Sequence, residues 1–457
     1  MFDLIVRDAT IVRADGPAER ADIAVKDGKV AALLKPRASL KAAETINATG
    51  KLVLPGVVDL HTHVQFARGL AGWRTETACA AQGGVTTIFN FLPASADGYL
   101  PLIAETKRVA AEVASVDFGL HVICCSEVHL TELPLYRDVG VSCAKAFMTY
   151  RGEEGRARGV VGTDDGYLTA YFAAAAHAGM PAAVHAENIE VIWRLRGQLQ
   201  RAGREDVAAW SESRPAFTEG EAVARALRLS APARGTVYFV HTSTFEALQE
   251  IRHWRCSKRS AQVHVETCPH YLTHSVSAVQ KWGVVGKVNP PLRGEGDVEA
   301  MWSGVSDGTI DSVGTDHCPH LLADKSAGSI WTVGGGFPGL GTILPVLVTE
   351  GHVKRGIPLS QIVALLSKRP AMLAGCYPKK GSLSVGSDAD LVVIDLSRWM
   401  AVDGRSVGGA AGYSLYDGAQ LTGWPDLTVV RGRAVSVMGE LQNGYGWGRY
   451  VSADRTV

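Results

Sequence analysis

Eight short apolar segments recur through the middle of the sequence, and a longer stretch follows each of them. These longer stretches, residues 99–115 and 165–179 among them, carry apolar residues at helical spacing. Strands that alternate with helices in this way predict a parallel (β/α)₈ barrel, a TIM-like fold of the α/β class. The eight segments are residues 57–64, 85–92, 117–124, 143–150, 181–188, 237–244, 263–270 and 311–318.

Both ends of the chain have a different pattern. Short strand-like segments at residues 2–7, 22–25 and 29–33 are separated by Asp-Gly turn signals, and similar segments occupy residues 391–396 and 426–439. We therefore expect the two ends to fold together into one small β-sandwich domain. The predicted division assigns residues 1–53 and 380–457 to this domain, and residues 54–379 to the barrel.

The charge balance excludes some classes of partner. Lys and Arg together number 46 and balance 46 Asp and Glu, so neither nucleic acid nor an anionic membrane is expected to bind. Neither a signal peptide nor an apolar run of about 18 residues is recognisable, and a cytoplasmic location is expected.

The cysteines form no C-x-x-C pair and are expected to be reduced, mostly buried thiols. They are Cys79, Cys124, Cys125, Cys143, Cys256, Cys268, Cys318 and Cys376.

Polar residues interrupt the predicted strands near their carboxyl ends. Seven of the eight strands carry His, Asp, Glu or Lys there, although a buried parallel strand is expected to be apolar. The carboxyl ends of the strands form the active-site face of such a barrel. His61 and His63 are two residues apart, so on a strand both imidazoles point to one face and can bind one ion. The alternative is a pair of barrel-lining histidines that bond to their neighbours.

Further candidates strengthen the metal hypothesis. His185, His241 and Asp316 also lie at strand ends, and imidazole with carboxylate is a ligand set that suits zinc. Lys145 lies within an apolar strand, where an unpaired charge would be expensive. A salt bridge to an acid would avoid that cost, and so would carboxylation by carbon dioxide. Among four histidines and an aspartate, the carboxylated lysine is the favoured interpretation.

This ligand pattern resembles the binuclear amidohydrolase superfamily. Additional motifs narrow the resemblance to the cyclic amidases of the hydantoinase/dihydropyrimidinase family, which are also similar to allantoinase and dihydroorotase. The likeness covers essentially the whole chain. The motifs are VLPGVVDLHTH at 53–63, VHAEN at 184–188, ETCPHYL at 266–272, VNPPLR at 288–293, TDHCPH at 315–320 and KKGSLSVGSDADLVVIDL at 379–396.

The resemblance implies two divalent metal ions per chain, with zinc as the expected element. It implies hydrolysis of the amide bond of a cyclic ureide or imide by a metal-bridging hydroxide, such as the opening of a hydantoin or dihydropyrimidine ring to an N-carbamoyl amino acid. One ion would be held by His61, His63 and Asp316, the other by His185 and His241, with carboxylated Lys145 between them. Relatives are usually tetramers, so a homo-oligomer, tetramer or dimer, is expected.

The resemblance also implies roles beyond metal binding. Asp316 would act as the general base that moves a proton from the hydroxide to the leaving nitrogen. Tyr150 would donate a hydrogen bond to the developing oxyanion, although it could also be only an aromatic residue at the barrel rim. Backbone groups at Asn289 and Gly335 would bind the substrate ring. Many hydantoinases have a small hydroxyl residue and an asparagine at these two positions.

Several alternatives bear on the substrate. Gln65 stands where a dihydroorotase has an arginine for the orotate carboxylate, which argues against that activity. Allantoinase stays open as an alternative. The intact ligand set argues against a non-catalytic assembly protein, and the VNPPLR and ETCPHYL motifs argue against the deacylation of linear N-acyl amino acids. The segment 66–73 could form an apolar wall for a ring substituent or pack against a neighbouring subunit.

Overall fold

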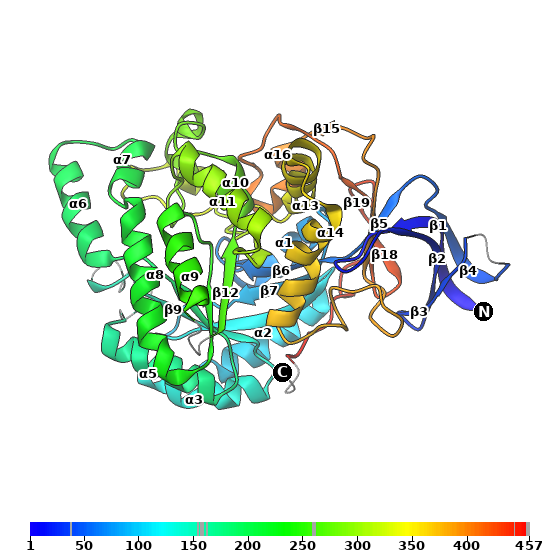
Figure 1. Ribbon diagram of the computed structural model, residues 1–457, viewed down its shortest axis with the longest axis horizontal. Coiled ribbons are helices and arrows are strands. Elements are labelled where there is room, and N and C mark those ends of the chain that lie inside the picture. Colours follow the sequence, from blue (N-terminus) through cyan, green and yellow to red (C-terminus); the bar gives the residue numbers. More distant parts are fainter. Residues whose placement is uncertain are drawn as a thin grey trace.

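Two β structures make up the framework of the protein (Figure 1). The computed structural model describes residues 1–36, 39–152, 155, 160, 163–257, 262–442 and 444–453. In this part of the chain the middle residues form an eight-stranded parallel barrel, and both chain ends contribute to a second sheet. In Figure 1 the blue amino-terminal strands and the red carboxy-terminal strands lie together at one side of the molecule.

The barrel strands are neighbours in chain order, which confirms the predicted (β/α)₈ arrangement. The main difference is at residues 311–318, where the strand keeps only Ser312–Val313, and Asp316 beyond it has a left-handed backbone (φ 49°) that no strand adopts. The barrel closes where Thr62 pairs in parallel with His317. The strands are β6 Val57–Thr62, β7 Val85–Phe91, β8 Asp117–Ile123, β9 Cys143–Phe147, β10 Ala182–His185, β11 Thr236–Phe239, β12 Gln262–Thr267 and β13 Ser312–Val313.

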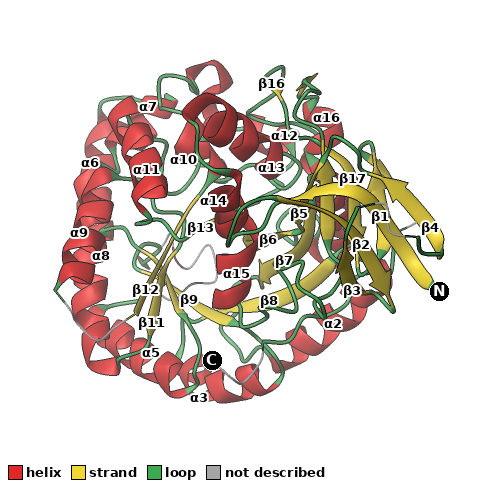
Figure 2. Cartoon of the chain, turned by 45° about the vertical axis from the view of Figure 1, so that its right-hand side comes forward, coloured by secondary structure: helices red, strands yellow, loops and turns green. Residues whose placement is uncertain are grey.

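Helices surround the barrel on the outside (Figure 2). They contain the two helical stretches expected from the sequence, now α2 and α5. No helix in the described ranges is both long enough and apolar enough to cross a membrane. The helices are α1 Gly72–Gln82, α2 Leu100–Val113, α3 Glu127–Asp138, α5 Asp165–His177, α6 Ile189–Arg201, α7 Val207–Glu212, α8 Ala216–Ser230, α9 Phe245–Cys256, α10 Pro269–Thr273, α11 Glu295–Asp307, α12 Leu322–Ser326, α13 Ile343–Val346, α14 Leu359–Val363, α15 Arg369–Leu373 and α16 Gly404–Val407.

The second sheet confirms that the two chain ends fold together. It is a mixed sheet of nine strands within the described residues, in which β5 pairs antiparallel with β14 and so joins the two ends. The exact limits of the two domains stay a prediction. The strands are β1 Phe2–Ile11, β2 Glu19–Lys26, β3 Lys29–Leu34, β4 Ala42–Asn47, β5 Leu52–Pro55, β14 Leu391–Ile394, β17 Pro425–Val430, β18 Arg433–Val437 and β19 Glu440–Leu441, and a small separate pair is β15 Met400–Ala401 with β16 Gln420–Leu421.

A buried ionic cluster connects the barrel with the chain-end sheet. The ammonium of Lys380 lies 2.7 Å from Asp390 and 3.0 Å from Asp388, and it also bonds to Asp117 at the start of β8. Arg431, between β17 and β18, bonds to the same Asp117 carboxylate. Burial would lower the pKa of Lys380, but the carboxylates of Asp390 and Asp117 outweigh burial and raise it. The lysine therefore supplies the charge that these three buried acids require.

Replacement of the central lysine should destabilise the fold. In Lys380→Met the three carboxylates lose their shared cation, so the free energy of unfolding should fall by about 3–5 kcal/mol. Lys354 offers a matched control, because it pairs with Glu350 at 2.7 Å with its side chain 54% exposed. Lys354→Met should change the stability by about 0.5 kcal/mol or less. Urea unfolding followed by circular dichroism measures both, and equal effects of the two substitutions would contradict the structural role of the cluster.

Candidate active site

The predicted site residues converge at the carboxyl end of the barrel. His61 lies on β6 and Lys145 on β9, while His185 is the last residue of β10. His241 and Asp316 follow the ends of β11 and β13. A cavity of about 280 Å³ opens among these strand ends, and His61 lies buried just beneath it. The other eight predicted residues all line the cavity: His63, Lys145, Tyr150, His185, His241, Asn289, Asp316 and Gly335.

Three of these residues form a compact buried group that could hold a metal ion. Their ligand atoms lie within 4.8 Å of one another. Oδ1 of Asp316 lies 3.2 Å from Nε2 of His61 and 3.3 Å from Nε2 of His63. Burial would raise the pKa of Asp316, but the two histidines outweigh burial and lower it. The group thus combines an ionised carboxylate with two imidazoles, a donor set that suits a zinc-class ion.

The other nitrogen-bearing candidate residues lie beside this group. The rings of His185 and His241 are 4.5 Å apart, and the ring of His241 is 5.3 Å from that of His61. Burial lowers the pKa of both His185 and His241, so the imidazoles are neutral and suited to metal binding. Nζ of Lys145 lies 3.0 Å from Nε2 of His61. Among the described residues no carboxylate forms an ion pair with Lys145, so the salt-bridge interpretation of this lysine finds no partner there.

Two imidazole nitrogen atoms among these histidines have no hydrogen-bond partner among the described residues, which bears on whether a metal would fit. Nδ1 of His63 and Nδ1 of His241 are buried and have no hydrogen-bond partner in the described part of the chain. Buried polar atoms are nearly always paired in folded proteins. These unpaired imidazole atoms, next to an ionised carboxylate, indicate that the cluster is completed by a ligand that the protein does not itself supply.

Two acidic residues behind the histidines fix the orientation of the rings. Oε1 of Glu266 lies 2.7 Å from Nδ1 of His61, and Oε2 of Glu187 lies 2.7 Å from Nε2 of His185. Arg214 bonds to the same Glu187 oxygen at 2.9 Å. A carboxylate on one ring nitrogen directs the other nitrogen toward a metal. The sequence contains both acids within the ETCPHYL and VHAEN motifs, but it offers no sign of their partners.

Backbone strain occurs at three of the same strand ends. Tyr150, His241 and Asp316 have φ values of 51°, 41° and 49°, in the left-handed region that non-glycine residues seldom adopt. Such conformations cluster at functional sites, where the surrounding structure enforces them. Here each turn redirects a side chain from the end of its strand into the cavity. The sequence did not predict this strain, since none of the three is a glycine, although histidine and aspartate adopt this region more often than most residues.

The residues expected to bind the substrate line the same cavity. Nδ2 of Asn289 donates a hydrogen bond of 2.7 Å to the hydroxyl oxygen of Tyr150. The ammonium of buried Lys325 bonds to the backbone oxygens of Lys287 at 2.8 Å and Gly336 at 2.6 Å. Those two residues are near neighbours of Asn289 and Gly335, so Lys325 ties together the two loops that form this wall.

The segment 66–73, which follows β6, contributes one aromatic side chain to the cavity. Phe66 lines the cavity and stacks on the ring of His63, with centroids 4.7 Å apart and an angle of 10°. It remains 46% exposed, whereas Trp73 is fully buried. Phe66 thus gives the cavity an aromatic edge that faces solvent. Gln65 is buried and accepts a bond from Asn90 at 3.2 Å, and it does not line the cavity.

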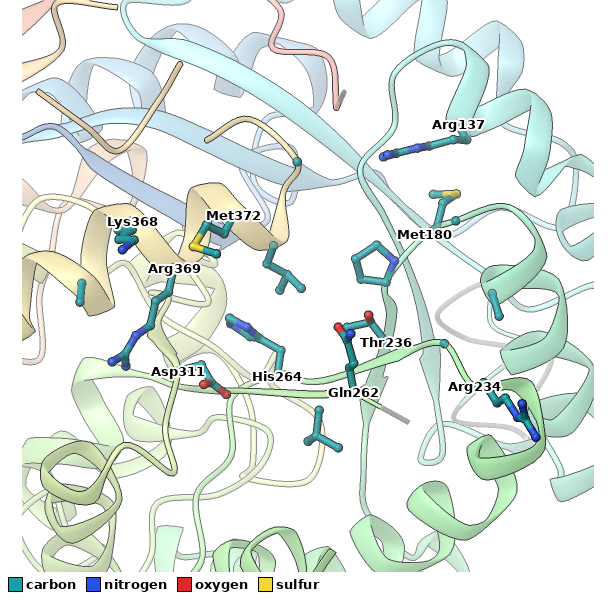
Figure 3. A pocket seen from close by; sticks show the side chains of 18 of the residues that line it. Arg137, Met180, Arg234, Thr236, Gln262, His264, Asp311, Lys368, Arg369 and Met372 are labelled. Atoms are coloured by element: carbon teal, nitrogen blue, oxygen red, sulfur yellow. The ribbon is translucent and has the colours of Figure 1, made fainter. Parts of the chain in front are cut away.

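A larger cavity of about 750 Å³ lies at the other end of the barrel, where β10, β11 and β12 begin (Figure 3). Several of its charged groups have partners within the chain. Asp311 pairs with Arg255 at 2.5 Å, and Lys368 pairs with Asp15. None of the predicted site residues lines it. Size alone therefore does not mark the active site, which lies in the smaller cavity with the metal-binding group.

Comparisons with known proteins agree with this geometry. The profile of the amidohydrolase family matches residues 52–435. An L-hydantoinase of Paenarthrobacter aurescens is 36% identical over 465 residues, 99% of this chain and 98% of that protein. An allantoinase of Deinococcus radiodurans is 32% identical over 454 residues, 96% of each chain. The solved structure of L-hydantoinase (dihydropyrimidinase) from Arthrobacter aurescens matches with a TM-score of 0.92 and 35% identity, over 99% of this chain and 100% of that one.

These matches extend over the barrel and the chain-end sheet alike, and the buried group of two histidines and an aspartate lies where such a barrel carries its chemistry. The chain belongs to the amidohydrolase family and is a cyclic amidohydrolase of the hydantoinase/dihydropyrimidinase type.

Proposed function

We propose that this enzyme opens the ring of a cyclic ureide or imide, with a hydantoin or a dihydropyrimidine as substrate and an N-carbamoyl amino acid as product. The main support is that the group of His61, His63 and Asp316 lies at one small cavity that a phenol and the loops of Asn289 and Gly335 also line. A planar five- or six-membered ring is compatible with a cavity of about 280 Å³.

We propose two divalent ions, with zinc as the expected element. The first would be held by His61, His63 and Asp316, and the second by His185 and His241. The ions would acidify the attacking water and polarise the scissile carbonyl. Lys145 would bind both ions after its amine has combined with carbon dioxide and lost a proton to give a carboxylate. Its complete burial, its position 3.0 Å from His61 and the lack of an acidic partner among the described residues support this modification.

The side chains of the chain would then carry the proton transfers. The carboxylate of Asp316 would take a proton from the attacking water and deliver it to the leaving amide nitrogen as the C–N bond breaks. The hydroxyl of Tyr150 would donate to the carbonyl oxygen as negative charge develops on it. Backbone groups at Asn289 and Gly335 would hold the ring. Each water molecule consumed thus adds its oxygen to the carbonyl carbon and a hydrogen to the nitrogen.

Allantoin is the alternative substrate, since its ring is a hydantoin with a ureido substituent and one relative is an allantoinase. Dihydroorotate is less favoured. Gln65 is neutral and buried against Asn90, so this position supplies no cation for the orotate carboxylate. Phe66 supports a preference for rings with an apolar substituent, since its exposed edge meets the cavity.

A substrate panel tests the proposal directly. The zinc-loaded enzyme would be assayed with hydantoin, dihydrouracil, allantoin, dihydroorotate and succinimide, and ring opening would be followed by liquid chromatography. We expect the highest kcat/KM for hydantoin or dihydrouracil. A highest value for allantoin would replace the proposal by its alternative, and a metal-loaded enzyme that opens none of these rings would refute it.

Metal content provides an independent prediction. The purified enzyme should contain about two zinc-class ions per chain, as measured by plasma mass spectrometry. Removal of the ions by a chelator should abolish ring opening, and added zinc should restore it. Full activity with metal well below one equivalent per chain would contradict the binuclear arrangement.

Glu266 should control metal affinity without binding the metal itself. Glu266→Gln weakens the acceptor on Nδ1 of His61, so zinc affinity should fall roughly 10- to 100-fold. Competition with a fluorescent chelator measures this change. Glu250→Gln on the exposed side of α9 is the control and should leave the affinity unchanged. Unchanged affinity in Glu266→Gln would show that the carboxylate does not orient the ligand.

Lys145→Ala should remove the proposed bridge between the ions. The variant should lose most of its bound zinc and nearly all activity, because the proposed bridging oxygens of the modified Lys145 are removed. Short carboxylic acids such as acetate, supplied together with zinc, should restore part of the activity by occupying the vacated position. Mass spectrometry of the intact wild-type protein under native conditions that reveals no carbon dioxide adduct would count against the modification.

Tyr150→Phe separates catalysis from binding. The substitution keeps the ring and removes one donor to the oxyanion, so kcat should fall roughly 10²- to 10³-fold with a smaller change in KM. Steady-state kinetics on the best substrate of the panel measures both constants. A raised KM with unchanged kcat would mean that the phenol only holds the substrate.

A further inference from the structure

The side chain of Asn289 has one satisfied and one unsatisfied polar atom. Its Nδ2 donates to the hydroxyl oxygen of Tyr150 at 2.7 Å. Its Oδ1 is buried and has no hydrogen-bond partner within the described residues. The residue is 8% exposed and lines the cavity that contains the metal-binding group. A buried amide oxygen is costly when it bonds to nothing, so its position on the cavity wall points to a ligand that completes it.

Gly335 makes room for this carboxamide. A Cβ atom at position 335 would lie 3.0 Å from Nδ2 of Asn289 and 3.2 Å from its Cγ. These distances are shorter than ordinary van der Waals contacts, so a larger residue would displace the side chain. The carboxamide thus occupies a space that the facing loop leaves open, and Lys325 holds that loop in register with the loop of Asn289.

The bond to Tyr150 also fixes which polar atom faces the cavity. Because Nδ2 is engaged by the phenol oxygen, the carboxamide oxygen is the atom left to face a substrate. The phenol oxygen accepts this bond, which therefore does not consume the hydroxyl hydrogen of Tyr150. An acceptor on Asn289 and a donor on Tyr150 then lie side by side.

The acceptor on Asn289 and the donor on Tyr150 match the N–H and C=O groups of a cis amide. An amide in a small ring is held cis, so its N–H and C=O point to the same side, whereas linear secondary amides are almost entirely trans. We propose that Oδ1 of Asn289 accepts the ring N–H next to the scissile carbonyl while Tyr150 donates to that carbonyl, so that the two side chains together select unsubstituted cyclic amides. The proposal rests on the proposed function and adds a specificity-determining side chain to it.

The test uses succinimide and N-methylsuccinimide, which differ only in the hydrogen that Asn289 would bind. Their dissociation constants would be measured by NMR titration on enzyme stripped of metal, so that no turnover occurs. The wild type should bind succinimide at least roughly tenfold more tightly, because a site built around a hydrogen bond rejects the analogue that lacks it. Asn289→Leu has a similar volume and no acceptor, and should reduce this ratio to within about twofold.

Two further variants guard against a merely structural effect. Asn289→Asp keeps an acceptor oxygen and should keep a preference for succinimide. Val160→Ala removes an apolar part of the same cavity and should change both affinities by the same factor. Equal binding of the two rings by the wild type, absence of binding, or an unchanged ratio in Asn289→Leu would each overturn the proposal. Rings that bind as expected but are not opened by the zinc-loaded enzyme would instead refute the proposed function alone.

Discussion

The buried carboxylate of Asp59 joins the first and last strands of the barrel. Its Oδ1 accepts from the backbone nitrogens of His61 at 3.0 Å and Thr315 at 3.1 Å, and its Oδ2 accepts from the Thr315 hydroxyl at 2.6 Å. Burial raises the pKa of Asp59 to about 6, although these donors oppose the rise. Because β13 has only two residues, it can form few backbone hydrogen bonds with β6. The bonds between Asp59 and Thr315 take the place of the missing ones. They bring Asp316, the next residue after Thr315, against His61, and the metal-binding group depends on that junction.

Rigid support extends outward from this junction. The imidazoles of His61 and His185 are fixed from behind by Glu266 and Glu187, and the left-handed backbone at Asp316 is enforced by its position directly after the Asp59 contact. A metal site needs its ligands preorganised, since side chains that must be ordered on binding reduce the affinity. The barrel accepts strained turns and buried acids at this one rim because eight paired strands hold the rest of the backbone in place.

Much of this arrangement could be predicted from the sequence, and the failures have a common cause. The barrel was predictable because its strands are apolar runs, and the candidate site residues because polar residues such as Lys145 conflict with packing in those runs. The partners of these residues were not predictable. Glu266 belongs to a motif, yet its bond to His61 spans 205 residues, and the bond between Asn289 and Tyr150 spans 139. Such contacts follow from the closure of the barrel, which no local pattern in the sequence encodes.

Two buried groups of side chains in the described chain have the residue types and spacing of a metal site. They differ in whether a positively charged side chain of the protein already pairs with the carboxylates. Asp117, Asp388 and Asp390 surround the ammonium of Lys380, so the protein itself supplies the cation, and the cluster joins the barrel to the chain-end sheet. The group of His61, His63 and Asp316 contains one carboxylate and two neutral rings, of which that of His63 has a buried nitrogen atom unpaired among the described residues, and His63 and Asp316 line a cavity. A charge cluster in which the protein supplies the cation stabilises the fold, whereas a buried carboxylate beside neutral imidazoles at a cavity has the donor set that suits a metal ion.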